Sequence, residues 1–183
     1  VTVSGSSSHA MRTGAINAAS PLTINVTGNI DGYTGANGSA GRPGANGSAG
    51  GDAIYWESST PYTGTGIVNI LSGGKVRGGG GGGGGGGLGQ VRDGYQVGDG
   101  KSPPSCDGPD VTGSTGSTGS AGGFGAAGSS GSSGGSVGGP PGGCPVVTAA
   151  GSGGSGGAAG FAVRKNSRTV TVNNSGTMNG SAG

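Results

Sequence analysis

The feature that most constrains this chain is a run of ten consecutive glycines, from Gly78 to Gly87. Such a run favours neither an α-helix nor an ordinary strand, because glycine has no side chain to pack and loses the most backbone entropy on ordering. Glycine also recurs at every third position in four further tracts, which cover residues 35–50, 113–122, 125–134 and 151–160. A period of three matches the polyproline-II type of helix, so the run predicts a polyglycine-II rod about 31 Å long at about 3.1 Å per residue. The Gly-x-x tracts are expected to form outer rods, so close that backbone N–H groups reach backbone carbonyls of their neighbours.

The composition excludes an apolar core of ordinary size. The chain has 183 residues, of which 53 are glycine, 28% are hydrophobic and 4% are aromatic. Such values are typical of a disordered or fibrous protein. A collagen triple helix would need a long unbroken Gly-X-Y tract with much more proline than the 9 residues present. We therefore expect stability to come mostly from hydrogen bonds between rods, each worth a net ~0.5–1.5 kcal/mol.

A second pattern occurs three times, at residues 22–32, 68–78 and 170–180. Each copy reads apolar, any, apolar, three residues, glycine, any, apolar, any, glycine. Alternating apolar residues predict a strand, the first glycine a turn, and the next apolar residue a short return strand. These strand–turn–strand starters should lead into Gly tracts and share a small satellite core. The predicted fold class is irregular and all-β-like: a bundle, or sandwich, of polyglycine-II helices with short starters and long loops.

Three segments between the tracts differ in composition, at residues 52–66, 88–111 and 140–150. The first two hold the tryptophan, three of the four tyrosines and most acidic residues. An inert scaffold with chemically rich loops is typical of recognition proteins, whose contacts concentrate in Tyr, Trp and Arg. The predicted contact residues are Tyr55, Trp56, Tyr62, Arg92, Asp93, Tyr95, Lys101, Pro103 and Pro104. Alternatively, the three aromatic residues of the first loop only seal the rod ends as hydrophobic plugs.

The two cysteines, Cys106 and Cys144, both lie in proline-rich segments flanked by Gly tracts. A disulfide between them would tie two loops together and contribute about 2–4 kcal/mol. It would also indicate an extracellular place of action. The alternative is two unrelated free thiols.

Several function classes receive no support from the sequence. Only 9% of residues are charged and the net charge is +2, which gives no basic stripe for a nucleic-acid partner. An apolar run of 18 residues is missing, so no insertion into a lipid membrane is expected. The single histidine, His9, lies in a serine-rich stretch and is predicted to be solvated. We expect no catalytic residue, metal site or cofactor, and hence no enzyme.

From about Leu22 onward, these tracts, starters and loops resemble the glycine-rich receptor-binding tip proteins of tailed bacteriophages. That group comprises the adhesins of T-even-type long tail fibres and the C-terminal tips of lambdoid host-specificity, or central tail fibre, proteins. The resemblance implies a polyglycine-II sandwich in the virion, at the distal tip of the tail fibre. Its end loops would bind an outer-membrane protein (a porin or transporter) or lipopolysaccharide, which sets host specificity.

The resemblance also suggests how the chain is organised. Residues 1–21 would be a lead-in or attachment segment, and residues 22–183 the glycine-rich receptor-binding domain. Other tail-fibre subunits are implied as partners, with this chain a monomer or part of a homotrimer. We expect the chain to be a piece of a longer protein.

Two further readings remain open on the sequence. A glycine-rich antifreeze protein also folds as a polyglycine-II bundle, but it needs long regular rods without aromatic loops. A disordered, elastic or cell-wall glycine-rich protein would lack a packed bundle and would be digested readily by proteases.

Overall fold

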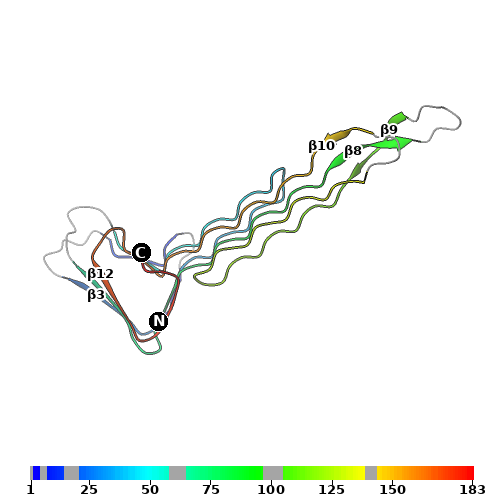
Figure 1. The fold of residues 1–183 in the computed structure, drawn as a ribbon. Coiled ribbons are helices and arrows are strands. Elements are labelled where there is room, and N and C mark those ends of the chain that lie inside the picture. Colours follow the sequence, from blue (N-terminus) through cyan, green and yellow to red (C-terminus); the bar gives the residue numbers. More distant parts are fainter. Residues whose placement is uncertain (1, 5–7, 15–20, 58–64, 97–104, 139–143) are drawn as a thin grey trace.

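The computed structural model describes residues 2–4, 8–14, 21–57, 65–96, 105–138 and 144–183. These residues form strands, turns and extended segments, and none of them lies in a helix. Figure 1 shows two parts along one long axis. A strand-rich end, here called the base, holds both labelled ends of the chain. A bundle of extended glycine-rich segments, the rods, leads away from the base to a small sheet, the tip.

The base consists of three parallel sheets, and the chain passes through all three of them three times. The first pass supplies β2, β3 and β4, the second β5, β6 and β7, and the third β11, β12 and β13. One sheet has the order β11(Val163–Arg164)-β5(Ile54–Tyr55)-β2(Met11–Arg12), and another the order β12(Val170–Asn174)-β6(Gly66–Ile70)-β3(Leu22–Val26). The third has the order β1(Thr2–Ser4)-β4(Asn29–Asp31)-β7(Lys75–Arg77)-β13(Thr177–Asn179).

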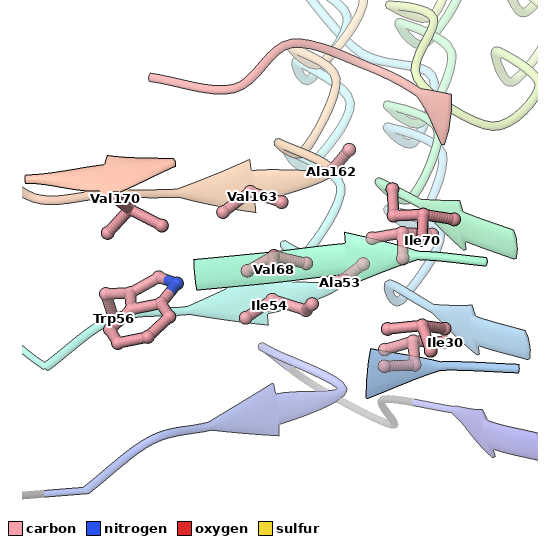
Figure 2. Close-up of a cluster of buried hydrophobic side chains, with 11 residues drawn as sticks. Ile30, Ala53, Ile54, Trp56, Val68, Ile70, Ala162, Val163 and Val170 are labelled. Atoms are coloured by element: carbon pink, nitrogen blue, oxygen red, sulfur yellow. The ribbon is translucent and has the colours of Figure 1, made fainter. Parts of the chain in front are cut away.

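The apolar core lies between these three sheets (Figure 2). Side chains of the middle pass are the most deeply buried, because the sheets cover them and the outer passes flank them. The largest fully buried apolar side chains of this pass are Ile54, Trp56, Val68, Ile70 and Val76. The small core predicted from the starters is therefore present, and Trp56 is its largest member.

The strand–turn–strand form of all three starters is confirmed, but the register of the middle copy differs from the sequence pattern. The pattern aligns Leu22 with Val68, whereas in the sheet Ile24 is the partner of Val68. The turn between β6 and β7 has four residues, against two in the other copies. Gly73 in this turn has a φ of 85°, a conformation that favours glycine. Because this turn is two residues longer, β6 begins at Gly66, two residues before Val68. An added Cβ at Gly66 would overlap the Trp56 ring.

A buried carboxylate connects the three passes. Asp52 is 1% exposed, and it accepts hydrogen bonds from Arg164 Nε at 2.6 Å and Nη2 at 3.1 Å. Nδ1 of His9 lies 3.0 Å from Oδ2 of Asp52, and the imidazole stacks on Tyr55 with ring centroids 4.1 Å apart. The prediction that His9 is solvated is therefore wrong. His9 forms part of the base, because its imidazole lies against the Asp52 carboxylate and stacks on the Tyr55 ring.

The rods are joined by backbone hydrogen bonds that repeat every three residues, as the glycine spacing predicts. Each carbonyl oxygen from Gly78 to Leu88 accepts a backbone N–H at 2.7 to 3.1 Å, and three neighbouring rods take turns as donors. These donor rods cover residues 32–41, 113–125 and 151–160. Most N–H groups of the central rod donate in turn to rods 44–51 and 126–135. The central glycines are therefore surrounded by backbone on every side.

The tip is a three-stranded antiparallel sheet of order β10-β8-β9. Its strands are β8(Val91–Gln96), β9(Ser105–Thr112) and β10(Val146–Thr148). The chain leaves the rods twice to build the tip, once to form β8 and β9 and once to form β10. Both of these excursions begin at the end of the rods away from the base (Figure 1). The tip therefore gathers residues from two of the predicted loops.

Candidate functional site

The predicted contact residues lie at opposite ends of the molecule. Tyr55 and Trp56 belong to the base, whereas Arg92, Asp93 and Tyr95 belong to β8 at the tip. The others lie outside the described residues: Tyr62, Lys101, Pro103 and Pro104. One recognition surface cannot include both groups, because the whole length of the rods separates them (Figure 1).

Trp56 does not form a surface contact site. Its side chain is 0% exposed and packs in the core, next to Gly66. Asn166 Nδ2 donates a hydrogen bond to the Trp56 carbonyl at 2.6 Å, which closes the loop around it. A side chain without exposed surface cannot touch a partner of the folded protein. The structure thus supports the plug interpretation for Trp56 and corrects its assignment as a contact residue.

Tyr55 is only half-buried, but its ring is occupied within the chain. His9 stacks on one ring, and the Arg12 guanidinium carbon lies 5.3 Å from the ring centroid. Arg12 also pairs with Glu57 at 2.5 Å. Tyr55 therefore helps to hold the first and second passes together.

Most of the exposed large apolar side chains among the described residues lie at the tip. Three of the five large apolar side chains with high exposure are there: Val111 at 48%, Val146 at 41% and Val147 at 56%. The other two, Leu71 and Phe124, lie toward the base, and Arg77 covers the Phe124 ring at 4.1 Å. The tip is therefore the part of the described structure where exposed large apolar side chains gather.

Arg77 is itself fixed by Asp31. Its Nε and Nη2 donate to the two carboxylate oxygens at 2.7 and 2.8 Å. This hydrogen-bonded pair raises the pKa of Arg77 above its ordinary value. The guanidinium therefore stays charged at every physiological pH.

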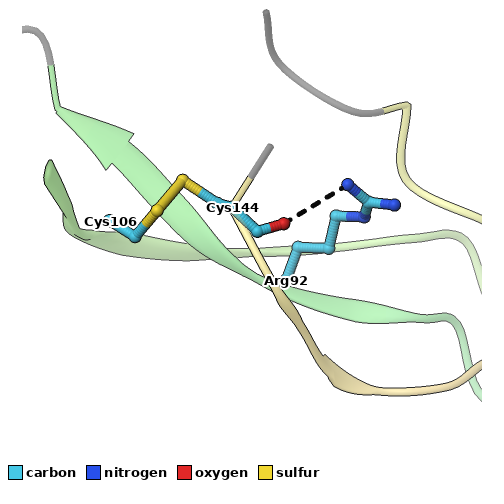
Figure 3. Close-up of a disulfide and its surroundings, with 3 residues drawn as sticks. All are labelled: Arg92, Cys106 and Cys144. Atoms are coloured by element: carbon cyan, nitrogen blue, oxygen red, sulfur yellow. Dashed lines mark hydrogen bonds between the residues drawn. A yellow bond between two sulfur atoms is a disulfide. The ribbon is translucent and has the colours of Figure 1, made fainter. Parts of the chain in front are cut away.

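A disulfide joins the two excursions that make the tip (Figure 3). Cys106 of β9 is bonded to Cys144, which lies 38 positions further along the sequence, and their Cα atoms are 5.6 Å apart. Cys144 is buried, and its carbonyl accepts a hydrogen bond from Arg92 Nη1 at 3.5 Å. The predicted pairing is therefore present. It fastens the short strand β10 to a sheet whose other strands belong to a different excursion.

Removing this disulfide is expected to loosen the tip and leave the rods folded. Reduction, or Cys106→Ser with Cys144→Ser, should destabilise the tip by about 2–4 kcal/mol. Amide hydrogen exchange should accelerate in β8 and β9 but not in the central rod, whose hydrogen-bond partners are other rods. The double serine variant should show no further change with reductant. Equal acceleration in the rods would contradict this division.

The part of the chain that the structure describes has neither a helix able to cross a membrane nor a cluster of three metal-binding side chains. The geometry defines a class of protein: a glycine-rich spacer that presents a small disulfide-fastened sheet at one end.

Comparison with known families names that class more closely. The sequence matches the family described as phage tail fibre adhesin Gp38 over residues 1–183, so the chain belongs to this family. Searches of curated proteins and of solved structures found no match. Membership places the protein at the tail tip of the virion and implies binding to a host receptor and to tail components. It also separates the adhesin interpretation from the ice-binding and structural alternatives.

Proposed function

We propose that the tip binds a receptor in the bacterial outer membrane and thereby determines which host the phage attaches to. The receptor is a porin or transporter, or lipopolysaccharide. The observation that carries this proposal is the separation of the exposed tip from the base by rods whose outward side chains are mostly small and uncharged. Such a spacer suits a protein that must hold one binding surface away from its attachment point.

The same arrangement assigns roles to the three loops. Residues 88–111 and 140–150 contribute to the receptor-binding end, whereas the described part of residues 52–66 helps to build the base. We propose that the base, together with residues 1–21, faces the tail-fibre subunits. The described part of 1–21 pairs with strands of residues 22–183, since β1 pairs with β4 and β2 with β5. The two segments therefore act as one structural unit.

We also propose that the rods are polyglycine-II helices. Hydrogen bonds to three successive neighbours with a period of three are what a three-residue helical turn requires. The core of the base is buried without a second chain, which supports a monomeric tip on the fibre. These features give the adhesin a rigid form that needs no partner to fold.

Binding of the labelled chain to Gram-negative cells tests the proposed function. Saturable binding that disappears with one porin or transporter gene, and returns on complementation, is expected for a protein receptor. Loss only in strains with truncated lipopolysaccharide would identify the sugar instead. Lys101→Glu, in the loop predicted at residues 88–111, should lower binding, whereas Lys75→Glu, an exposed residue of the base, should not. A folded chain that binds no strain would refute the proposal.

A further inference from the structure

One face of the tip sheet carries an arginine between two exposed valines. Arg92 of β8 is the direct partner of Val146 in β10 and of Val111 in β9. Directly opposed residues in neighbouring strands point to the same face of a sheet. The three side chains therefore form a continuous row across the tip sheet, here called the Val–Arg–Val row.

The guanidinium in this row has donors to spare. Its one described hydrogen bond is the contact from Nη1 to the Cys144 carbonyl, at 3.5 Å (Figure 3). Nε is buried and has no hydrogen-bond partner. Nη2 makes none of the described hydrogen bonds either, so the guanidinium can still donate to an incoming acceptor.

The acidic side chain next to Arg92 lies on the other face of the sheet. Neighbours along a regular strand point to opposite faces, so Asp93, next to Arg92 in β8, is directed away from the row. The described salt bridges do not include Arg92. The row thus combines a basic side chain with two apolar ones.

We propose that the Val–Arg–Val row is a docking surface for a protein loop that carries a carboxylate flanked by aliphatic side chains. The carboxylate would accept hydrogen bonds from Arg92, and the aliphatic groups would cover Val111 and Val146. This inference rests on the proposed function and specifies the chemistry of its receptor: an acidic, aliphatic segment of an outer-membrane protein. Lipopolysaccharide would offer anionic groups but no aliphatic side chains beside them.

The first test compares charge placed on the row with charge placed beside it. Val111→Asp and Val146→Asp should each weaken binding to a susceptible strain by about tenfold or more, because they remove apolar contact and repel the carboxylate. Val147→Asp is the matched control: it is more exposed than either valine but lies outside the row, at a register irregularity. This control should bind within about threefold of the parent chain.

The second test examines the charge pair itself. Surface carboxylates of the cells are converted to neutral amides with a carbodiimide and ethanolamine. This treatment should weaken binding of the parent chain about a hundredfold and have little further effect on Arg92→Gln. Arg92→Lys should recover part of the loss, since it keeps the charge without the two-pronged geometry. Thiol titration confirms for each variant that the disulfide, and with it the tip, is intact.

The outcomes separate the two proposals. A parent chain that binds cells equally well before and after protease treatment, or binds vesicles of lipopolysaccharide alone, would overturn the protein loop but keep the adhesin function. Equal binding by Val111→Asp, Val146→Asp and Val147→Asp would overturn the row as the docking surface. A parent chain that binds no cells would overturn both.

Discussion

Replacing Gly82 with alanine is expected to unfold the rod bundle. The new Cβ would overlap the carbonyl oxygen of Ala36, which already accepts the N–H of Ser48 at 2.8 Å. Gly82 itself donates to Ser48 at 2.9 Å and accepts from Gly157 at 2.7 Å. Because backbone cannot turn aside as a side chain can, relief of the overlap must break bonds to several rods. We expect a loss of more than about 4 kcal/mol in the free energy of unfolding.

The matched control is Gly123→Ala. A Cβ at Gly123 would have no atom within 4 Å, so this substitution should change stability by less than about 0.5 kcal/mol. Denaturant titration followed by circular dichroism measures both variants against the parent chain. Equal midpoints for Gly82→Ala and Gly123→Ala would show that the central rod is not closely packed.

Replacing Trp56 with alanine is expected to have the second largest effect. Trp56 is the largest fully buried side chain, and it lies in a core with few other large members. Truncation of a buried tryptophan should cost about 3–5 kcal/mol through lost contacts and the cavity left behind. Below its lowered melting temperature, the variant should still bind cells like the parent chain, because the base lies far from the tip. A folded variant that has lost binding would return Trp56 to the contact surface.

A double-mutant cycle checks that this effect arises in the core. In the parent chain, Gly66→Ala should be destabilising, because its Cβ would overlap the Trp56 ring. In the Trp56→Ala background the ring is gone, so the same change should cost much less. Additive effects of the two substitutions would mean that the ring does not lie against Gly66.

The sequence predicted the features that depend on backbone periodicity. Glycine at every third position leaves room for backbone on one edge, and ten glycines in a row leave room on three, so the hydrogen-bonding repeat follows directly. The disulfide was also predictable, because both cysteines lie in proline-rich segments between tracts. The role of Trp56 was not, since a lone tryptophan in a loop is compatible with a plug and with a contact residue alike.

The end to which each loop belongs follows from how often the chain crosses the bundle. Residues 32–41 lead away from the base and residues 44–51 return, so the segment after Gly51 lies at the base again. The central rod leads outward once, and the segment after Leu88 lies at the tip. Counting tracts alone could not give this result, because the turn at Arg42 and Pro43 is hidden inside one unbroken Gly-x-x pattern. The register of the middle starter was missed for a related reason: the pattern fixes the spacing of apolar residues but not the length of a turn.

The three-residue repeat of hydrogen bonds between rods fixes which positions of each triplet must be glycine. Most outer rods present glycine to their neighbours at one position in three and mostly small side chains at the other two, and rod 151–160 adds Gly153 and Gly156 against a second neighbour. Deleting a single residue from any outer rod would turn those side chains inward along the remainder of that rod, whereas deleting three would keep the phase. Length changes in this adhesin are therefore compatible with the fold only in whole triplets, and only when neighbouring rods change together. The excursions at the tip can change length by any number of residues, because they lie outside the repeating backbone hydrogen bonds that join the rods.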